Sequence, residues 1–509
     1  MTGTYRRETY PMEAKMGNKA VEQEIAQTES VPPSILEKII QEGRMVRDDS
    51  QREYAKDLIC EFASQVLEES MVVAKDMIAA LEARIAAIDQ VISNQLNAIM
   101  HHKEFQELEA SWRGLHYLVY NTETGHSLKL KLLNISKSDL QNDLEKAVDF
   151  DQSQIFKKVY EEEFGTFGGA PFGLLLGDYD FGRTAQDVAL LEKIASIAAS
   201  AHAPFIAAAN PKLFDVHSFA DITAPRDLSK IFESNEMVKW RSFRESEDSR
   251  YVALTLPRIL IRPPYGENSL AIEELNFNED VSGKESGKYL WGNPAYALAR
   301  TITSAFSKYK WCAAIRGVEG GGLVEGLPVH TFKTDDGDTA LKCPTEIAIT
   351  DRRERELNDL GFITLVHCKG TDYAAFFGGQ TVNKPKHYDT VDANANARIS
   401  AILPYILAAS RFAQYLKAIM RDKIGSFTNA DSIQSFLNRW ISNYVLGKDD
   451  AGQEMKARYP LREARVDVFE MPGKPGCYNA VIFLRPHFQL EELTTSIRLV
   501  AELPQSAAK

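Results

Sequence analysis

The sequence predicts a mixed α/β protein with long N-terminal helices, an α/β core containing βαβ units, and a β-rich C-terminal tail. Three observations support this fold class. Apolar residues recur every three or four positions from about residue 57 to 121, which is the period of an amphipathic helix. Two apolar runs within residues 172–209 flank a helical segment, as in a strand–helix–strand unit. Short apolar runs separated by turn residues follow residue 465 and are typical of strands.

Composition and charge narrow the class of protein. The chain has 509 residues, of which 44% are hydrophobic and 26% are charged, as in soluble globular proteins that bury two or three cores. Its formal charge of -12 repels phosphate backbones, and no long Lys/Arg block reverses that, so nucleic acid is not an expected partner. We find no signal-peptide pattern and no apolar run long enough to span a membrane. The sequence therefore predicts a cytoplasmic protein without membrane insertion.

Cysteine usage agrees with a reducing compartment. The five cysteines are scattered and form neither a CxxC pair nor a spacing suited to zinc, so we expect free thiols. They are Cys60, Cys312, Cys343, Cys368 and Cys477.

Residues 1–55 read as a flexible N-terminal arm that carries one short amphipathic helix. Ser34 and Glu37 form a capping-box pattern, and Gly43 can end the helix. A helix this short is marginal in water unless it buries its apolar stripe. On the residues alone, docking on the protein's own core is the expected fate. The stripe consists of Ile35, Leu36, Ile39 and Ile40.

The helical pattern of residues 57–121 predicts two long helices. Ile78, Leu81 and Ile85 begin a stripe that continues to Trp112 and beyond, with a polar break at residues 101–103. The adjacent histidines at this break could ligate a metal. No carboxylate or cysteine accompanies them at a supporting spacing, so we expect a solvated junction instead.

The core begins near residue 165. We expect a strand at 172–177, a loop at 177–182, a helix at 184–202 and a second strand at 204–209, which together make a parallel, right-handed βαβ unit. Further strands are predicted at 251–256, 311–315 and 362–367.

The C-terminal part is predicted to contain helices followed by strands. A helical pattern covers residues 392–421 with a kink expected at Pro404, and a second helix is predicted at about 430–446. Strands are predicted at 465–471, 477–484 and 494–503.

The run RGVEGGGLVEG at residues 316–326 could be a phosphate-binding loop or only a turn. A P-loop requires Lys and Ser or Thr after its last glycine, but Leu323 and Val324 follow Gly322. Glu319 and Glu325 would also place negative charge beside a phosphate. The sequence therefore favours a turn that needs glycine backbone geometry.

Asp178 and Asp180 are the other candidate site, because ligands of open α/β sheets bind beyond the carboxyl ends of strands. Two alternate carboxylates could bind magnesium, but no kinase catalytic loop or nucleophile motif accompanies them. We expect these residues to hold the loop in place or to cap the helix at Thr184. We therefore predict no catalytic, cofactor-binding or metal-binding residues, with an α/β enzyme with a site near Asp178 and Asp180 as the alternative.

Long segments of the chain resemble the large subunit of the type VI secretion system contractile sheath, in order from about residue 50 to the end. One departure is Gln414, where the family commonly has histidine; we expect this difference to be peripheral. The segments are EFQELEASWRGLHYLV from Glu104, LLLGDYDFG from Leu174, AHAPFIAAA from Ala201, ESEDSRYVALTLPRILIRPPYG from Glu245, YLWGNPAYALA from Tyr289, WCAAIRGVEGGGLVEGLP from Trp311, CPTEIAITDRRERELNDLGF from Cys343, RDKIGSF from Arg421 and LRPHFQLEELTTSIRLVAELP from Leu484.

The resemblance implies a structural protein and not an enzyme. Such subunits pair with a small sheath subunit, stack with copies of themselves as a helical tube on a baseplate, surround an inner tube of hexamers, and contract to drive it into a target cell. An AAA+ ATPase then recycles the sheath, in some members by gripping an N-terminal helix. This reverses our expectation for Ile35, Leu36, Ile39 and Ile40, which become the ATPase-binding residues. A non-contractile scaffold is the remaining structural alternative.

The expected domains follow from the same comparison. They are an arm at 1–55, a helical pair with an α/β sheath domain at 56–220, an inserted outer α/β domain at 221–385, and a long helix with a β-rich assembly domain at 386–509.

The terminal strand supports assembly independently of the resemblance. Its apolar residues alternate on one face at the end of a chain that has little left to cover its edge. An uncovered strand pairs with another chain, and a head-to-tail contact that does not close makes a helical filament. We therefore expect an inter-subunit strand that contains Thr495, Ile497, Leu499, Ala501 and Leu503.

Overall fold

The computed structural model describes residue 40 and the ranges 51–67, 77–223, 227–266, 269–272, 285–334, 336–423, 429–448, 450–470 and 478–487, together with residues 275, 277–281, 283 and 472. The chain divides into two compact units, residues 1–87 and 88–509. Among the helices in the described part of the chain, none combines the length and the apolar character needed to cross a membrane.

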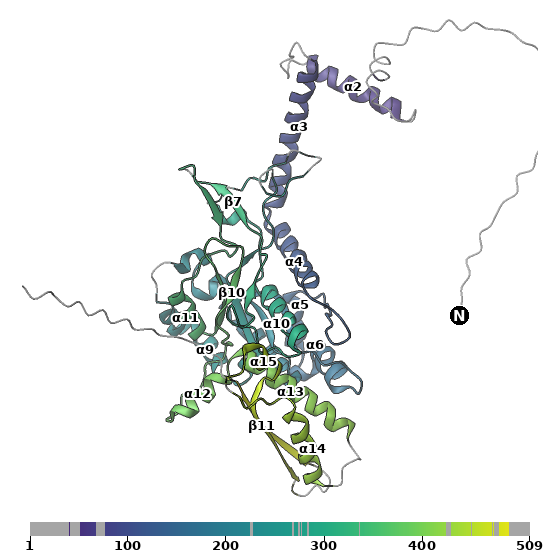
Figure 1. Cartoon of the computed structure of the whole chain (residues 1–509). Helices are drawn as coiled ribbons and strands as arrows, with labels where there is room; N and C mark the ends of the chain where they lie inside the picture. The colour runs from purple at the N-terminus through teal and green to yellow at the C-terminus, as the bar shows by residue number, and fades with distance from the viewer. Residues whose placement is uncertain are drawn as a thin grey trace, which may run out of the picture. The chain divides into compact units, whose positions relative to one another are not determined.

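The predicted helical pattern of residues 57–121 is confirmed, but among the described residues it forms three helices and not two. They are α2 (Arg52–Leu67), α3 (Met77–Met100) and α4 (Lys103–Tyr120), as Figure 1 shows. The predicted break is confirmed, because His101 and His102 separate α3 from α4. The backbone N–H groups of His101 and His102 still donate to Asn97 O and Ile99 O. The chain therefore changes direction at this break without leaving these two N–H groups unpaired.

A six-stranded sheet forms the centre of the second unit. Its strand order is β1-β2-β3-β9-β10-β6. The first four strands are parallel, and β10 and β6 complete one edge in antiparallel pairing. The predicted parallel βαβ unit is therefore confirmed, with α7 (Ala185–Ala201) as its crossover. The strands are β1 (Leu175–Phe181), β2 (Phe205–Ala209), β3 (Val252–Leu256), β6 (Leu323–Val324), β9 (Phe362–His367) and β10 (Ala374–Phe376).

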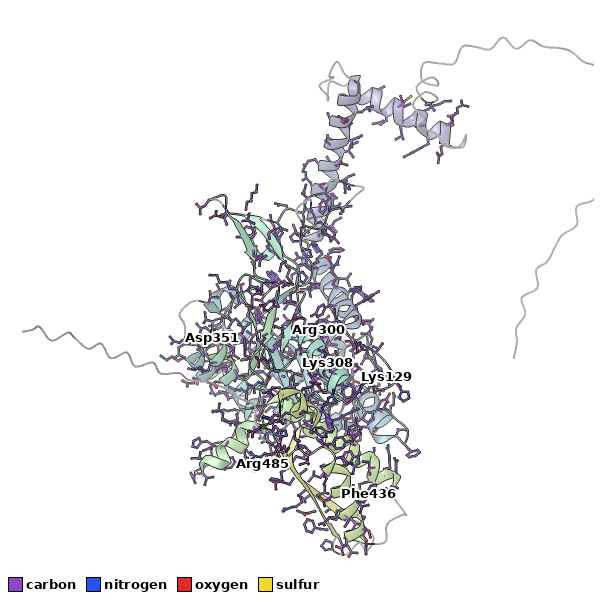
Figure 2. All side chains as sticks on the ribbon, viewed as in Figure 1. Lys129, Arg300, Lys308, Asp351, Phe436 and Arg485 are labelled. Atoms are coloured by element: carbon purple, nitrogen blue, oxygen red, sulfur yellow. The ribbon has the colours of Figure 1, made fainter. Side chains whose placement is uncertain are left out.

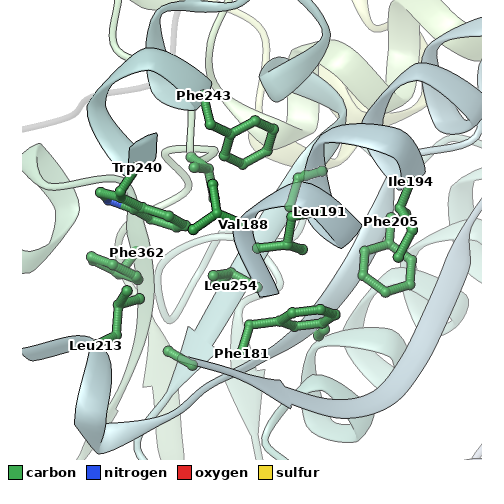
Figure 3. Packing of buried hydrophobic residues seen from close by; sticks show 14 of the residues in the cluster. Phe181, Val188, Leu191, Ile194, Phe205, Leu213, Trp240, Phe243, Leu254 and Phe362 are labelled. Carbon is green, nitrogen blue, oxygen red and sulfur yellow. The ribbon is translucent and has the colours of Figure 1, made fainter. Parts of the chain in front are cut away.

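Alternate residues of the central strands supply two different cores, because successive side chains of a strand point to opposite faces. Phe205 and Ala207 of β2 face the core that includes α7, whereas Ile206 faces the core that includes α10 (Ala295–Tyr309). In the α7 core, the ring of Trp240 lies over that of Phe362 with centroids 6.1 Å apart (Figure 3). The sheet is thus covered by helices on both faces.

The C-terminal part has its own apolar core. Helix α13 (Leu403–Asp422) and helix α14 (Ala430–Ser442) pack with the antiparallel hairpin of β11 (Leu461–Glu470) and β12 (Tyr478–Pro486). Figure 1 shows α14 beside β11. The helix predicted at 430–446 and the two strands predicted before residue 485 are confirmed.

Three predictions about local structure were wrong. The strand at 172–177 begins later and runs through Phe181, because Phe181 alternates into the core where a loop was expected. Residues 311–315 are not a strand: α10 ends in a left-handed Lys310, and Trp311 is instead held by stacking on Phe412. Pro404 does not kink a long helix but lies in the first turn of α13, where its missing N–H costs nothing.

The remaining elements surround this frame. Strands on both sides of residue 220 share one sheet, and the domain boundaries at 55, 220 and 385 stay predictions. The other helices are α5 (Lys137–Lys146), α6 (Gln154–Phe156), α8 (Leu228–Glu233), α9 (Val238–Glu245), α11 (Asp351–Asp359), α12 (Val391–Ile399) and α15 (Gln453–Arg458); the other strands are β4 (Ile259–Leu260), β5 (Trp291–Gly292), β7 (His330–Lys333) and β8 (Thr339–Lys342).

Candidate assembly surface

Helix α4 packs against α10 through one close contact. A Cβ atom added at Gly114 would lie 2.5 Å from the Tyr296 ring, so only glycine permits this approach of the two helices. Leu118 is buried in the same contact, and Thr122 Oγ1 lies 3.1 Å from Thr303 Oγ1. One face of α4 is therefore fixed to the body of the protein.

The opposite side of α4 exposes an apolar stripe. Leu108 and Trp112 are 57% and 63% exposed; Phe105 extends the stripe three residues before Leu108, and Val119 extends it seven residues after Trp112. Single exposed apolar residues are normal on a protein surface, but a contiguous stripe marks an interaction site. We call Phe105, Leu108, Trp112 and Val119 the α4 stripe.

Helix α3 exposes a second stripe with the same spacing. Five of its exposed apolar residues follow one another at intervals of four, three, four and seven, which is the heptad spacing of a helix that pairs with another helix, and Val91 is exposed beside them. Of the α3 side chains that the structure describes, only that of Ser93 is buried. The α3 stripe consists of Leu81, Ile85, Ile88, Ile92 and Ile99.

A buried charge cluster anchors α4 and the junction that precedes it. The Arg262 side chain is only 4% exposed and donates to Glu109 of α4 and to Glu279, with shortest N–O distances of 2.7 Å to each. Glu279 also accepts from the backbone N–H of Tyr265 and lies 3.3 Å from His101 Nε2. The α3–α4 junction and the loop after β4 are thus tied to one carboxylate.

The electrostatics of the cluster favour its charged state. Burial alone would raise the pKa of Glu109, but hydrogen bonds and charge from Arg262 and Arg113 outweigh burial and hold that pKa below its usual range. Burial would likewise lower the pKa of Arg262, and the two carboxylates raise it instead. The pKa of the Glu109 carboxyl is lowered and that of the Arg262 guanidinium is raised, as a stable ion pair requires.

Sequence reasoning missed this cluster, although one signal was present. Arg262 follows the apolar run that contains β4, and an arginine so placed must find a carboxylate if it is buried. The sequence could not say which carboxylate, because Glu109 and Glu279 lie 153 and 17 positions away.

The β11–β12 hairpin offers a third exposed apolar surface. Val466 and Val468 face the C-terminal core, whereas Phe469, Val481 and Phe483 are exposed on the other face. Arg485, labelled in Figure 2, lies on the exposed face of β12, with its guanidinium 3.7 Å from Glu463. Within the described residues, β12 pairs only with β11.

The predicted site residues are only partly within the described part of the chain. Ile40 is helical and 3% exposed, which agrees with a helix that buries this position. Ile35, Leu36 and Ile39 lie outside the described residues. The predicted inter-subunit strand, with Thr495, Ile497, Leu499, Ala501 and Leu503, lies outside them as well.

The glycine run is a turn, as predicted. Gly317 and Gly321 have φ of 70° and 88°, which favour glycine. The Gly317 N–H donates to Phe376 O and the Gly322 N–H donates to Gly317 O, at 2.7 and 2.8 Å. These N–H groups are therefore satisfied within the protein, and the run leads directly into β6 beside β10.

Asp178 and Asp180 lie within β1 and not in a loop. Asp178 accepts from Asn293 Nδ2 at 3.3 Å, and Asp180 accepts from Asn210 Nδ2. Neither residue caps α7, because the Thr184 hydroxyl accepts the N–H of Asp187 as the N-cap. In the described ranges, no group of three or more His, Cys, Asp or Glu side chains could hold a metal ion.

Gln414 is not peripheral, so this expectation was wrong. The side chain is buried on α13, and its Nε2 lies within 3.0 Å of three backbone carbonyl oxygens, those of Phe172, Ala201 and His202. Its Oε1 accepts from Arg411. One side chain thereby joins α13 to the segment before β1 and to the end of α7, whose last carbonyls have no helical partner.

Comparison with known proteins gives a consistent result along the chain. The family model described as the EvpB/VC_A0108 tail sheath N-terminal domain matches residues 82–383. The model described as the EvpB/VC_A0108 tail sheath gpW/gp25-like domain matches residues 392–503. The type VI secretion system sheath protein TssC1 of Pseudomonas aeruginosa PAO1 is 52% identical over 463 residues, which cover 90% of this chain and 93% of that protein.

Two solved structures are more distantly similar. A chain of the anti-feeding prophage baseplate gives a TM-score of 0.35 at 9% identity, covering 74% of this chain and 84% of that chain. A chain of the contracted anti-feeding prophage helical sheath gives a TM-score of 0.30 at 11% identity, covering 63% and 67% respectively.

Proposed function

The chain belongs to the tail sheath family of type VI secretion systems, and we propose that it pairs with a small sheath subunit through the α3 and α4 stripes. The pairs then polymerise as a helical sheath on a baseplate around an inner tube of hexamers, in the cytoplasm. Contraction of this sheath drives the inner tube into a target cell. Force generation needs no nucleotide in this subunit if the extended sheath is assembled in a metastable state.

The exposure of the two stripes carries this proposal. Burying one Leu or Ile side chain contributes about 1.5–3 kcal/mol, so leaving a stripe of them in water is costly unless a partner covers it. The heptad spacing on α3 fits a partner helix, whose knobs would fill the spaces between these residues. The Arg262 cluster supports the same role, because it fixes one face of α4 while the stripe stays free.

Polymerisation through the C-terminal tail is the second part of the proposal. The β11–β12 hairpin ends 23 positions before Lys509, and the predicted strand with Leu499 lies in that remainder. A strand added beside a hairpin edge gains backbone hydrogen bonds, which would link neighbouring copies while rigid cores move. Leu499→Pro removes one such bond, and we expect it to abolish tubules while the subunit still folds. Tubules of normal length from this variant would disprove the strand exchange.

The N-terminal helix completes the proposed cycle. We assign Ile35, Leu36, Ile39 and Ile40 to recognition by an AAA+ ATPase that disassembles the contracted sheath. Ile40 is 3% exposed in this chain alone, so recognition by the ATPase would require this side chain to leave its present contacts. Ile39→Asp with Ile40→Asp should abolish binding of a 30–45 peptide to the N-terminal domain of the ATPase. Unchanged binding in a titration would rule this assignment out.

Co-expression with the small sheath subunit tests the central proposal. We expect the wild type to co-purify with the small subunit and to form tubules visible by electron microscopy. Leu108→Glu with Trp112→Glu should lose both, because each carboxylate would be desolvated in the contact. Val148→Asp is the matched control, since Val148 is 87% exposed and lies outside both stripes. Normal pairing by the Leu108/Trp112 variant would show that the α4 stripe is not the contact.

A further inference from the structure

Helix α14 occupies the outer edge of β11 with two side-chain amides. Asn438 Oδ1 accepts from Val466 N at 2.9 Å, and Asn438 Nδ2 donates to Val466 O at 2.8 Å. A neighbouring antiparallel strand would make the same pair of bonds with such a residue. One turn earlier on α14, Gln434 Oε1 accepts from Val468 N at 3.1 Å. The β11 edge is therefore already bonded within the chain, and an added strand would have to displace these amides.

The outer edge of β12 follows from the register of the hairpin. Residues opposite each other in an antiparallel pair either bond to each other or both direct their backbone groups outward. Val466 lies opposite Ile482, and Val468 lies opposite Ala480. Because the two valines bond to α14, Ile482 and Ala480 direct their N–H and C=O groups away from β11. Within the described part of the chain, no strand pairs with this edge of β12.

The side chains of β12 define the kind of strand that fits beside it. Ile482 and Leu484 pack against the C-terminal core, whereas Val481 and Phe483 are exposed on the other face. An added strand extends both faces of a sheet, so its apolar residues are needed on the core side. The predicted strand at 494–503 has this pattern, because its apolar residues alternate on one face.

The end of β12 favours a strand from another copy of the chain. His487 N donates to Pro460 O, and His487 O accepts from the Tyr405 hydroxyl. Pro460 directly precedes β11, so it lies on the side of β12 that faces away from the open edge. The first residue after β12 is thus held by the body of its own subunit and not directed toward that edge.

We propose that the hairpin accepts a strand at the β12 edge alone, because Asn438 and Gln434 close the β11 edge. The incoming strand is the 494–503 segment of a second copy, and it bonds to the backbone of Ala480 and Ile482. This assignment rests on the proposed function, in which that segment links neighbouring subunits. An open strand edge is a template for unwanted pairing. Closing one edge therefore limits each hairpin to a single incoming strand.

Hydrogen exchange in the isolated full-length subunit tests the two edges without requiring assembly. Val466 and Ile482 lie opposite each other, so local opening of the hairpin affects both, and only the bonding of their N–H groups differs. We expect the Val466 amide to exchange at least about tenfold more slowly than the Ile482 amide, measured by mass spectrometry with residue-level fragmentation. Equal fast rates would show that α14 does not close the β11 edge. Equal slow rates would show that the chain's own tail covers β12, and would overturn the second copy as occupant.

Two proline variants separate the outward and inward groups of β12. Ala480→Pro removes an outward N–H from an exposed residue, which an edge strand tolerates. We expect this variant to keep slow exchange at Val466 and to form no tubules with the small sheath subunit. Val481→Pro is the matched control, because it removes an N–H that bonds to β11 and should speed exchange throughout the hairpin of the isolated subunit.

The outcomes of the proline experiment distinguish this assignment from the proposed function. Normal tubules from Ala480→Pro would overturn the β12 edge as the acceptor. Absence of tubules from the wild type would instead contradict the proposed function, while the exchange rates of Val466 and Ile482 would still decide between the edges. In wild-type tubules, the Ile482 amide should become as slow as that of Val466.

Asn438→Leu tests whether α14 closes the other edge. The variant loses both bonds to Val466, so we expect the Val466 amide to exchange about tenfold faster or more. The isolated subunit should also self-associate more than the wild type in light scattering, because a second edge is open. Ser442→Ala is the matched control on the same helix, since the Ser442 hydroxyl is exposed and donates to Asn438 O. An Asn438→Leu subunit with unchanged exchange and unchanged association would overturn the closing role of α14.

Discussion

Helices α10 and α3 carry similar apolar patterns but have opposite environments. Ten residues of α10 are buried, and among them Leu298 and Ile302 lie against the central sheet. In α3 the isoleucines are exposed and the buried residue is a serine, among the side chains that the structure describes. The difference shows that an apolar stripe predicts burial without saying which chain provides the cover. Helix α4 combines both cases, with Gly114 on its covered side and Trp112 on its exposed side.

The largest expected effect comes from breaking the charge cluster on the covered side of α4. Arg262→Met leaves Glu109 and Glu279 buried without their cation, which should lower the free energy of unfolding by about 3–5 kcal/mol. Arg113→Met is the matched control, because that pair with Glu109 is partly exposed and should cost only about 0–1 kcal/mol. Urea denaturation followed by tryptophan fluorescence measures both. Equal costs would mean that Arg262 does not anchor α4.

A smaller effect is expected from crowding the contact between α4 and α10. Gly114→Val should destabilise the protein by about 1–3 kcal/mol, because its Cβ would overlap the Tyr296 ring. Gly125→Val is the control, since nothing lies within 4 Å of a Cβ atom at that glycine. Thermal unfolding of the two variants checks the difference. A Gly114→Val protein as stable as its control would show that α4 can move away from α10 at no cost.

The smallest effect is expected on the uncovered helix. Ile88→Ala and Ile92→Ala should each change the free energy of unfolding of the isolated subunit by less than about 0.5 kcal/mol, as exposed positions do. The same changes should weaken binding of the small sheath subunit, measured by titration, if the α3 stripe is the contact. Losses of several kcal/mol in the isolated subunit would instead place these residues in a core of this chain.

The sequence predicted the central elements where two signals agreed. Helix α7 and strand β2 were predicted within one or two residues, because Thr184 supplies a cap and the apolar period changes from helix to strand. The end of β1 was missed because Asp178 and Asp180 resemble loop residues, although Tyr179 and Phe181 continue the alternation of a strand. Local polarity outweighed periodicity in that prediction, and the burial of Phe181 decided the structure.

The candidate surface was less predictable than the fold. The apolar stripes were visible in the sequence, but a three-and-four spacing is the same for a helix that packs within its chain and for one that packs on another chain. Gln414 shows the converse limit. From the sequence alone, a single glutamine is expected at the surface. Only the folded chain places three carbonyl oxygens around its side-chain amide. Long-range partners of this kind leave no local pattern.

The order of strands in the sheet has a consequence for how the chain is made. Strand β9 pairs with β3 in the centre of the sheet, yet about a hundred residues separate them in the sequence. At a synthesis rate of about 5–20 residues per second, the ribosome needs roughly 5–20 s to deliver β9 after β3 has emerged. During that interval the edge of β3 is open to other chains. Bringing distant strands together also slows folding, because the entropy lost on closing the loop is compensated only after the strands have paired. Newly made subunits are therefore most prone to aggregate before residue 367, the end of β9, has left the ribosome.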